Sequence, residues 1–426
     1  MRSAAATLLN GRTFSSVRKH RNYRLYFYGQ LVSLSGTWMQ DTALPWLVLV
    51  LTHSPVDVGV LVFCRYVPFL FFGLYAGLIA DRHDNRRLLI ATQVASMTIA
   101  AALAAATLTH WTPLWLVFLL ATLGGTSLVF ESPNRHALVY QLVGREELPN
   151  AVALNSSIFN GARAVGPALG GGLIALVGAG WCFAFNSASF LAILVGLLLM
   201  QTRELFPVER ASRAEPALVA IRDGLAYARR SLPVRIVLGM TLVISVAGFN
   251  FRVLVPVLAE KTLVAGAAVF GVLFACFGIG ALVGALLTAS LGRASWRALV
   301  AGSVLFNGAV LALAPLRSVA AAAILLLVCG LGFSLWTSNS QSVLQLTTPD
   351  RLRGRVLSLY LLSFAGLQPL GGLLAGWLAD IGGTELAFLV AGAAGLASTA
   401  AALDSVRGVR LPRQRPVAIA ADDGGD

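Results

Sequence analysis

The segment that decides the fold is Gly77-Leu-Ile-Ala-Asp81-Arg82-His83-Asp84-Asn85-Arg86-Arg87, where a long apolar run ends in a carboxylate and a cluster of arginines. An apolar run of about 20 residues is long enough for a helix to cross the hydrocarbon core of a bilayer. Basic residues directly after such a run favour the cytoplasmic side. A glycine such as Gly77 also allows a neighbouring helix to come close. The segment therefore predicts where a membrane-spanning helix leaves the bilayer on its inner face.

The composition indicates a membrane protein. Of the 426 residues, 57% are hydrophobic and 12% are charged, whereas a soluble domain has about 25% charged residues. The net charge of +13 would suggest nucleic-acid binding in a soluble chain. Here the arginines lie at the ends of apolar segments, which is the pattern of membrane orientation and excludes a nucleic-acid patch.

Apolar length predicts twelve membrane spans in an all-α chain. The even number places both termini on one side. The first 24 residues contain no acidic residue and no short apolar core before a cleavage site, so we expect the first helix to act as its own insertion signal. The spans are expected at residues 25–50, 57–80, 87–108, 113–138, 149–177, 181–201, 235–258, 267–291, 297–315, 319–345, 356–379 and 384–404.

The arginines predict the orientation of these spans, because basic loops stay inside. The loops that carry few basic residues, such as Thr52-His-Ser-Pro-Val and Gly178-Ala-Gly, are expected outside. We therefore expect a bacterial inner-membrane protein with both termini cytoplasmic. The inner segments are the N-terminal arm, 81–87, 135–147, 202–235, 292–297, 350–355 and a tail with Arg407, Arg410, Arg413 and Arg415.

The longest polar interval, 202–235, divides the chain into two sets of six spans. It predicts an N-terminal bundle over residues 1–204, a cytoplasmic linker over 205–234, and a C-terminal bundle with a basic tail over 235–426. Within the linker, residues 217–230 have apolar side chains at helical spacing. This stretch is either a helix on the membrane surface or a solvated connector.

The segment 77–87 resembles motif A of the major facilitator superfamily. The matching residues are Gly77, Asp81, Arg82, Arg86 and Arg87, and the resemblance implies that they form a gate between the second and third helices. The family has glycine at the position of Asp84. The resemblance implies two six-helix bundles that rock about a central site.

A second motif, Gly166-Pro167-Ala-Leu-Gly170-Gly171, is similar to motif C of the drug and proton antiporters in that superfamily, although Ala162 replaces an expected glycine. Proline bends a helix, and glycines let helices touch, so the motif predicts a hinge that seals the outer half. Ordinary small-residue packing is the alternative. A similar stretch, Gln368-Pro369-Leu-Gly371-Gly372, occurs about 200 residues later in the chain. This similarity indicates an internal repeat.

The polar stretch from Arg145 to Arg163 resembles the enterobactin exporter and macrolide efflux branch of the superfamily, the transmembrane secretion effector type. The first span, from Gly29-Gln30 to Pro45-Trp46, is similar to the same branch. In the second half the resemblance is carried mainly by 353–356 and 371–372.

A few ionisable residues lie within the spans, where charge is costly and marks a functional site by default. Asp41 and Arg65 both lie roughly 14–15 Å below the outer surface, so they are able to pair. Glu131 and Arg135 are one helical turn apart, and Arg163 lies near the middle of the fifth span. We interpret Asp41 and Glu131 as proton-coupling carboxylates, with Arg65, Arg135 and Arg163 as charge partners. The alternative is that each pair is a static brace.

In the superfamily the first, fourth, seventh and tenth spans line the cavity. The resemblance therefore implies that polar and aromatic residues on the seventh and tenth spans lie near the substrate, although they also suit helix–helix hydrogen bonds and anchoring. They are Asn250, Arg252, Trp336, Asn339 and Gln341.

The motifs of other classes are missing from the sequence. The two lysines, Lys19 and Lys261, follow Arg18 and Glu260, so there is no phosphate-binding loop. The five histidines and four cysteines are scattered without the spacing of a metal site, a nucleophile or a disulfide framework. We expect no enzyme activity, no cofactor and no metal.

Together these patterns favour a monomeric proton-coupled exporter of a hydrophobic or amphipathic small molecule, such as a drug or a siderophore. Its partners would be the substrate, protons and the lipid bilayer. An importer, a facilitator, a lipid transporter and a non-transporting receptor of the same fold remain alternatives.

Overall fold

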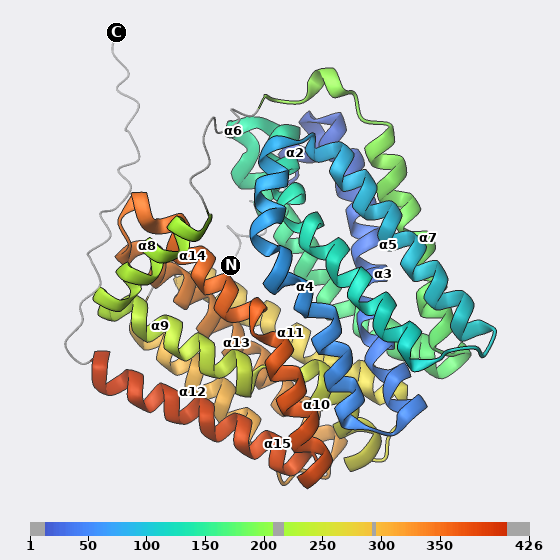
Figure 1. Ribbon diagram of the computed structural model, residues 1–426, viewed down its shortest axis with the longest axis vertical. Helices are drawn as coiled ribbons and strands as arrows, with labels where there is room; N and C mark the ends of the chain where they lie inside the picture. Colours follow the sequence, from blue (N-terminus) through green and yellow to red (C-terminus); the bar gives the residue numbers. More distant parts are fainter. Residues whose placement is uncertain (1–12, 208–216, 292–294, 407–426) are drawn as a thin grey trace, which may run out of the picture.

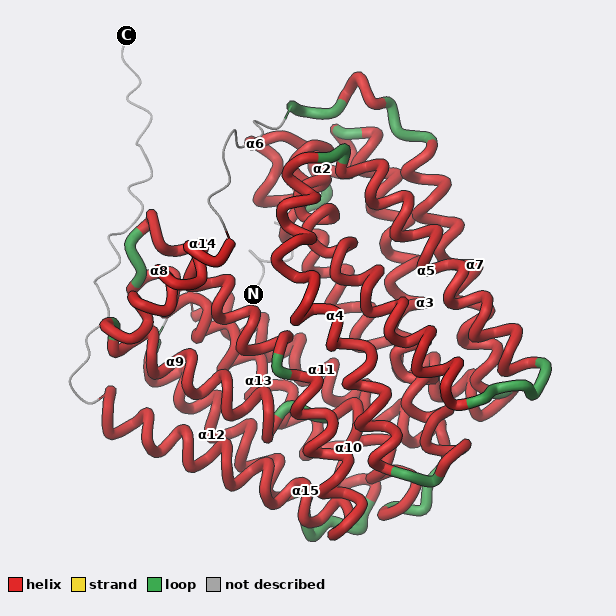
Figure 2. The backbone as a smooth tube through the Cα atoms, viewed as in Figure 1, coloured by secondary structure: helices red, strands yellow, loops and turns green. Residues whose placement is uncertain are grey.

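A computed structural model describes residues 13–207, 217–291 and 295–406, and all regular structure within these ranges is helical (Figures 1 and 2). The all-α fold class is confirmed. In chain order the segments are α2 (Ser15–Lys19), α3 (Arg21–Thr52), α4 (Pro55–Arg82), α5 (Asn85–Leu108), α6 (Leu114–Val177), α7 (Ala179–Leu198), η1 (Thr202–Glu204), α8 (Ala217–Arg230), α9 (Leu232–Val243), η2 (Ile244–Gly248), α10 (Phe251–Val257), η3 (Leu258–Thr262), α11 (Ala267–Leu291), α12 (Trp296–Ala312), α13 (Val319–Thr347), α14 (Asp350–Leu361), η4 (Leu362–Gly366) and α15 (Gln368–Val406).

Two of the helices turn back at a glycine and so contain two segments each. In α6 the break is Gly144, with φ 68°, and in α15 it is Gly383, with φ 66°. A side chain would be strained at either φ, so glycine suits the turn. The sequence predicted separate spans on both sides of these two points.

Eight helical stretches of the described residues are long and apolar enough to cross a membrane. Two of them, Leu114–Val177 and Leu352–Ser405, are long enough to cross twice and contain the glycine breaks. Dividing them there, and adding α3 and the shorter apolar α12, gives the twelve predicted segments. The count of twelve spans itself stays a prediction.

Side-chain caps fix where several helices begin. The Ser54 hydroxyl accepts a hydrogen bond from the backbone N–H of Asp57 at 3.3 Å at the start of α4. Asp84 accepts from the backbone N–H groups of Arg86, at 2.9 Å, and Arg87, at 3.2 Å, at the start of α5. Aspartate is a strong N-cap residue because it satisfies N–H groups that have no partner in the helix. Asp84 therefore starts the third span at the position where the superfamily motif has glycine.

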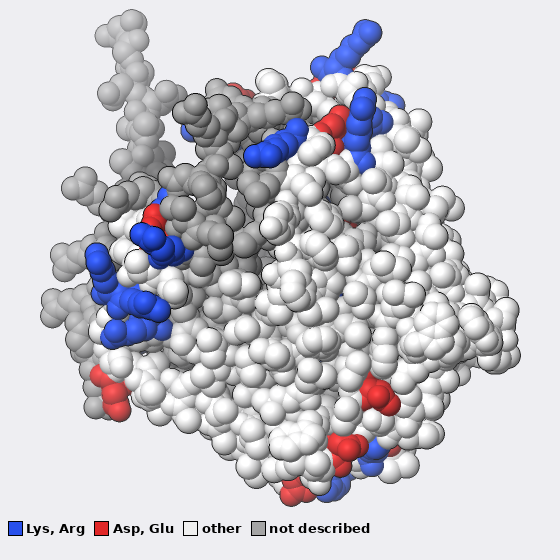
Figure 3. Space-filling model, viewed as in Figure 1, with Lys and Arg blue, Asp and Glu red and all other residues white. Residues whose placement is uncertain are grey.

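Charge is concentrated at the two ends of the molecule. We call the end with α2, α8, α14 and the α4–α5 turn the arginine-rich end. The other end, with the turns at His53, Gly178 and Gly383, is called the opposite end. Lysine and arginine gather at the arginine-rich end, and the surface between the ends is almost free of charge in the view of Figure 3. Many large apolar side chains are exposed, as in a protein surrounded by lipid, among them Phe71, Leu176, Leu286 and Ile324.

The two halves of the chain meet at the opposite end and diverge toward the arginine-rich end (Figure 1). At the opposite end the Trp46 and Phe270 rings stack with centroids 5.5 Å apart. His53 Nδ1 lies 3.2 Å from a carboxylate oxygen of Glu260. The halves are therefore packed together at this end.

The linker segment 217–230 forms helix α8, as its helical spacing predicted. The helix packs on α14 rather than standing alone: the Tyr227 hydroxyl donates to the carbonyl of Thr347 at 2.9 Å, and Arg355 pairs with Asp223 at 2.6 Å. Neither earlier alternative described this contact with the C-terminal half. Part of the linker, residues 208–216, and the basic tail with Arg407, Arg410, Arg413 and Arg415 lie outside the described residues. The domain boundaries stay a prediction.

Candidate functional site

The seventh span is broken in the middle. Helix α9 continues into a π-helical turn, η2, and then Phe249 and Asn250 leave the helical conformation before α10 begins. The side-chain amide of Asn250 donates a hydrogen bond to the backbone carbonyl of Val246 at 2.9 Å. One carbonyl of the interrupted helix therefore has a side-chain partner. Irregular backbone at membrane depth is tolerated where it lines a cavity or is buried in protein. The sequence-based prediction of one continuous span over 235–258 missed this break.

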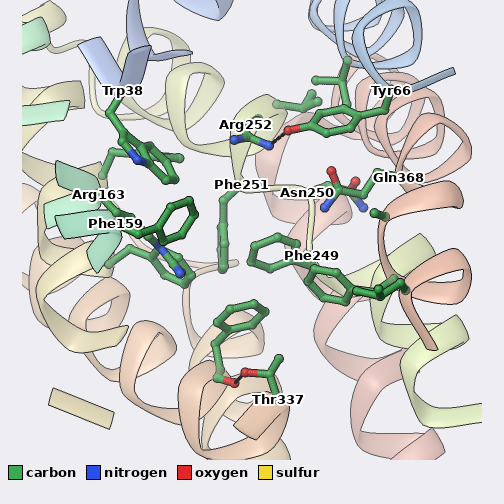
Figure 4. A pocket seen from close by; sticks show the side chains of 18 of the residues that line it. Trp38, Tyr66, Phe159, Arg163, Phe249, Asn250, Phe251, Arg252, Thr337 and Gln368 are labelled. Carbon is green, nitrogen blue, oxygen red and sulfur yellow. Dashed lines mark hydrogen bonds between the residues drawn. The ribbon is translucent and has the colours of Figure 1, made fainter. Parts of the chain in front are cut away.

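The break lies beside a cavity of about 410 Å³ between the two halves, here called the central cavity. Its lining comes from α3, α4 and α6 of the first half and from segments between Phe249 and Gln368 of the second half. Figure 4 shows Phe249 and Phe251 near the middle of this site, with Arg163 and Phe159 on one side and Asn250 and Gln368 on the other. The volume is that of a typical small-molecule site.

Asp41 joins the two halves at the edge of the central cavity. One carboxylate oxygen lies 2.5 Å from Arg65 of the same half, and the other lies 3.1 Å from Arg252 of the second half. Arg252 also hydrogen-bonds to the hydroxyl of Tyr66, as the dashed line in Figure 4 shows, and its guanidinium lies 5.2 Å from the Tyr66 ring centroid. We call Asp41, Arg65 and Arg252 the Asp41 bridge.

Arg163 does not approach either predicted carboxylate. Its guanidinium carbon lies 5.1 Å from the ring centroid of Phe277 and 5.4 Å from that of Phe333, both in the second half. Its assignment as a charge partner is therefore corrected, because its side chain reaches into the aromatic part of the central cavity rather than toward Asp41 or Glu131.

Glu131 and Arg135 form the pair that their spacing suggested. Their closest atoms are 3.5 Å apart on one face of α6, and both side chains are largely buried. Both residues belong to the same helix, so this pair does not connect the two halves.

The predicted substrate residues separate into two groups. Asn250, Arg252 and Gln341 line the central cavity. Trp336 is fully buried and stacks on Phe306 at a centroid distance of 6.5 Å, and the side-chain carbonyl of Asn339 accepts from the backbone N–H of Ser295 at 3.1 Å. These last two side chains pack between helices, so their placement near the substrate is corrected.

The motif A residues make local structural contacts at the arginine-rich end. Arg86 donates to the carbonyls of Leu197, at 2.7 Å, and Leu198, at 3.3 Å, at the end of α7. Arg87 lies 3.6 Å from Asp84, and Arg82 is exposed. The side chain of Asp81 lies outside the described residues.

Gly77 has no described atom within 4 Å of the position that a side-chain Cβ would take. The described residues therefore do not show the close helix approach expected at Gly77.

The motif C glycines lie at tight helix crossings. A Cβ on Gly166 would lie 2.5 Å from Trp38 on α3, and one on Gly171 would lie 2.6 Å from the carbonyl oxygen of Ala267 on α11. Gly170 packs on Met39 of α3, and Pro167 is inside helix α6. The Gly171 crossing joins the two halves near the opposite end.

The sequence did not predict the aromatic character of the cavity or the contact of Arg252 with Asp41. Phe249, Phe251, Phe277 and Phe333 pack against one another there, with the Phe249 and Phe333 rings stacked at 4.4 Å. Aromatic residues at three- or four-residue spacing are common in any helical core, so this signal is not specific.

Comparison with known families agrees with this architecture. A family model described as a transmembrane secretion effector matches residues 12–420. Among solved structures, a crystal structure of the peptide transporter POT superposes with a TM-score of 0.73, covering 90% of this chain and 94% of that one at 13% identity. At that identity the likeness concerns the fold alone.

Three related proteins align with most of this chain in sequence. The "Staphyloferrin A transporter" of Staphylococcus aureus is 30% identical over 87% of this chain and 92% of its own length. The "Multidrug efflux pump Tap" of Mycolicibacterium fortuitum is 26% identical over 93% of this chain and 97% of its own. The "Enterobactin exporter EntS" of Escherichia coli O157:H7 is 27% identical over 96% and 98%.

Proposed function

Because this chain belongs to the transmembrane secretion effector family, within the major facilitator superfamily of transporters, we propose that it is a proton-driven exporter of a small molecule. It is a multi-pass membrane transporter and not an enzyme. Two relatives are named as an efflux pump and an exporter, which supports outward transport. The proposal places the chain in the bacterial inner membrane, as a monomer with cytoplasmic termini.

The Asp41 bridge is the observation that carries the proposal. Arg65 belongs to the same half as Asp41, so the two move together when the halves rock. Arg252 belongs to the other half and is 3.1 Å from Asp41 in the conformation in which the opposite end is closed. Rocking therefore changes the contact of Asp41 with Arg252 and leaves its contact with Arg65.

This change of partner provides a way to couple protons to transport. In the closed conformation the Asp41 carboxylate pairs with Arg65 and Arg252. When substrate binding separates the halves at the opposite end, Asp41 loses Arg252 in a membrane-buried site and takes a proton from the newly accessible side. When the halves close again, Arg252 returns and the proton leaves toward the arginine-rich end.

The direction of transport follows from the predicted orientation. With the arginine-rich end in the cytoplasm, the closed opposite end faces outward, and the central cavity loads from the inside. Substrate then leaves to the outside, and the proton taken up by Asp41 from the outside is released to the cytoplasm.

Glu131 remains the second proposed proton-coupling carboxylate, with Arg135 as its partner. Rocking does not by itself separate two residues of one helical segment, so the Glu131 pair needs access to water, rather than exchange of partners, to change its protonation. We therefore place the main coupling step at Asp41.

The test is uptake into inverted membrane vesicles that contain the full chain, with a panel of antibiotics and catecholate siderophores and an imposed proton gradient. Asp41→Asn is expected to abolish gradient-driven accumulation while substrate counterflow without a gradient remains. Glu385→Gln, which removes an exposed carboxylate paired with Arg317, is the control and is expected to retain accumulation. Unchanged gradient dependence in both Asp41→Asn and Glu131→Gln would overturn proton coupling at these sites.

A further inference from the structure

The charged residues that line the central cavity are both arginines. Arg163 and Arg252 line it from opposite halves of the chain, and no described aspartate, glutamate, lysine or histidine belongs to the lining. A cavity that held organic cations would be expected to present carboxylates. This cavity presents positive charge and aromatic rings.

The two arginines differ in how their charge is compensated. Arg252 shares Asp41 with Arg65, so one carboxylate serves two guanidinium groups. Arg163 has no carboxylate within 4.0 Å among the described residues, and its guanidinium lies over the rings of Phe277 and Phe333. The described residues therefore leave the cavity with uncompensated positive charge.

An uncompensated guanidinium at membrane depth is costly. Contact with aromatic faces offsets part of that cost, but it does not satisfy the five N–H donors of the guanidinium. These donors match carboxylate and other planar anions, which they bind in a bidentate manner. The side chain is partly accessible and lines the cavity, so a ligand inside the cavity is able to reach it.

The surroundings of Arg163 add a second requirement. Rings at the centre of the cavity lie close to one another: Phe249 and Phe333 stack at 4.4 Å, and Phe251 lies 4.9 Å from Phe277. These rings line the cavity, and a planar aromatic ligand is able to pack against their faces and edges. Phe159 and Phe251 lie near Arg163 in Figure 4, so the anion site and the aromatic surface adjoin.

We propose that the central cavity takes a small aromatic anion, with the acidic group of the ligand bound by Arg163 and its ring packed among Phe249, Phe277 and Phe333. This inference rests on the proposed function, because it names the substrate class of the same cavity. It excludes lipophilic organic cations as the preferred substrates.

Binding to the full chain in nanodiscs of zwitterionic lipid tests the proposal without any gradient. The probes are naphthalene carboxylate, the neutral naphthalene methanol and the cationic naphthylmethylammonium, which share one ring system. We expect the carboxylate to bind at least about tenfold more tightly than the neutral probe, as a charge-assisted hydrogen bond would give. Equal binding of all three probes, or tightest binding of the cation, would overturn it.

Two variants connect this preference to Arg163. Arg163→Gln is expected to remove the preference for the carboxylate and to retain binding of naphthalene methanol, which shows that the cavity is intact. Arg163→Lys is expected to retain part of the preference, because it keeps the charge. Arg317→Gln, which changes an exposed arginine outside the cavity that pairs with Glu385, serves as the control and is expected to show wild-type binding.

An Arg163→Gln variant that still prefers the carboxylate would contradict the role of Arg163. Binding and proton coupling are measured separately. If the binding assay shows no anion preference, the proposal for Asp41 is unaffected. If the vesicle assay shows no proton coupling, the proposal of an anion site is unaffected.

Discussion

At the scale of single residues, Glu147 connects the start of the described chain to the turn within α6. Its carboxylate accepts hydrogen bonds from Ser15, at 2.6 Å, and Ser16, at 3.3 Å, and pairs with Lys19. The hydrogen bonds from Lys19 and Ser15 lower the pKa of Glu147 below its usual value. Glu147 therefore fastens α2 to the first half at the arginine-rich end.

This contact predicts a dependence of stability on pH. A carboxylate whose pKa is lowered in the folded state stabilises the protein above its unfolded pKa of about 4.3, and that contribution is lost as the pH falls through the folded pKa. Glu147→Gln is expected to lower the free energy of unfolding at neutral pH by no more than about 1 kcal/mol and to lose less stability on acidification than the wild type.

Thermal unfolding in detergent at a series of pH values below neutral measures this effect. Glu146→Gln changes the exposed neighbour and is expected to follow the wild-type profile. If Glu147→Gln and the wild type lose the same stability between neutral pH and about pH 3, the contact does not stabilise the fold.

The sequence predicted part of the Asp41 bridge. Asp41 and Arg65 lie at similar depths on two neighbouring spans, and the constant rise of a helix was enough to bring them together. Arg252 is 211 positions from Asp41, and its approach depends on how the two halves cross and on the break at Phe249. Local periodicity encodes neither the crossing of the halves nor the break in the helix. The sequence therefore predicted that Arg252 lies near the substrate but did not predict its ion pair with Asp41.

At the scale of elements, the halves are joined by two similar glycine crossings. Gly171 on α6 faces Gly271 on α11, where a Cβ would lie 2.6 Å from the Gly271 Cα. Gly59 on α4 faces Gly372 on α15, where a Cβ on Gly59 would lie 2.6 Å from the Gly372 carbonyl oxygen. Gly171 and Gly372 belong to the two stretches that the internal repeat related in the sequence, so both stretches take part in crossings between the halves.

A matched pair of neighbouring glycines tests whether these crossings hold the opposite end closed. Gly171→Ala is expected to destabilise the closed conformation by about 1–3 kcal/mol, the usual cost of overpacking, and to slow transport. Gly172→Ala is expected to be neutral, because no described atom lies within 4 Å of its Cβ position. Thermal stability and vesicle transport of the two variants provide the comparison, and equal behaviour of both would remove the crossing as a seal.

Helix positions were predicted more fully than helix interruptions. Apolar length located the membrane segments, because the bilayer sets the number of residues needed to cross it. The π-helical turns and the break at Phe249–Asn250 depend on contacts made after folding, such as the hydrogen bond of 2.5 Å from the Ser245 hydroxyl to the carbonyl of Phe364. Such contacts leave no periodic signal in the chain.

At the scale of the whole molecule, the proposed mechanism joins the central cavity and the Asp41 bridge in one alternating-access cycle. The halves converge at the opposite end and diverge toward the arginine-rich end (Figure 1). The Asp41 bridge lies where they meet, and its second arginine changes position whenever the halves separate. In the proposed cycle, a proton on Asp41 and a closed opposite end therefore oppose each other.

The distance across the opposite end, measured by electron paramagnetic resonance as a function of pH, tests this most directly. Spin labels at Trp111→Cys and Val264→Cys, both exposed in loops of different halves, are placed in a chain whose four native cysteines are replaced by alanine. We expect acidification to increase the fraction of long distances in this background, and Asp41→Asn to make the distribution independent of pH. A pH-dependent shift of the same size in the Asp41→Asn chain would contradict it.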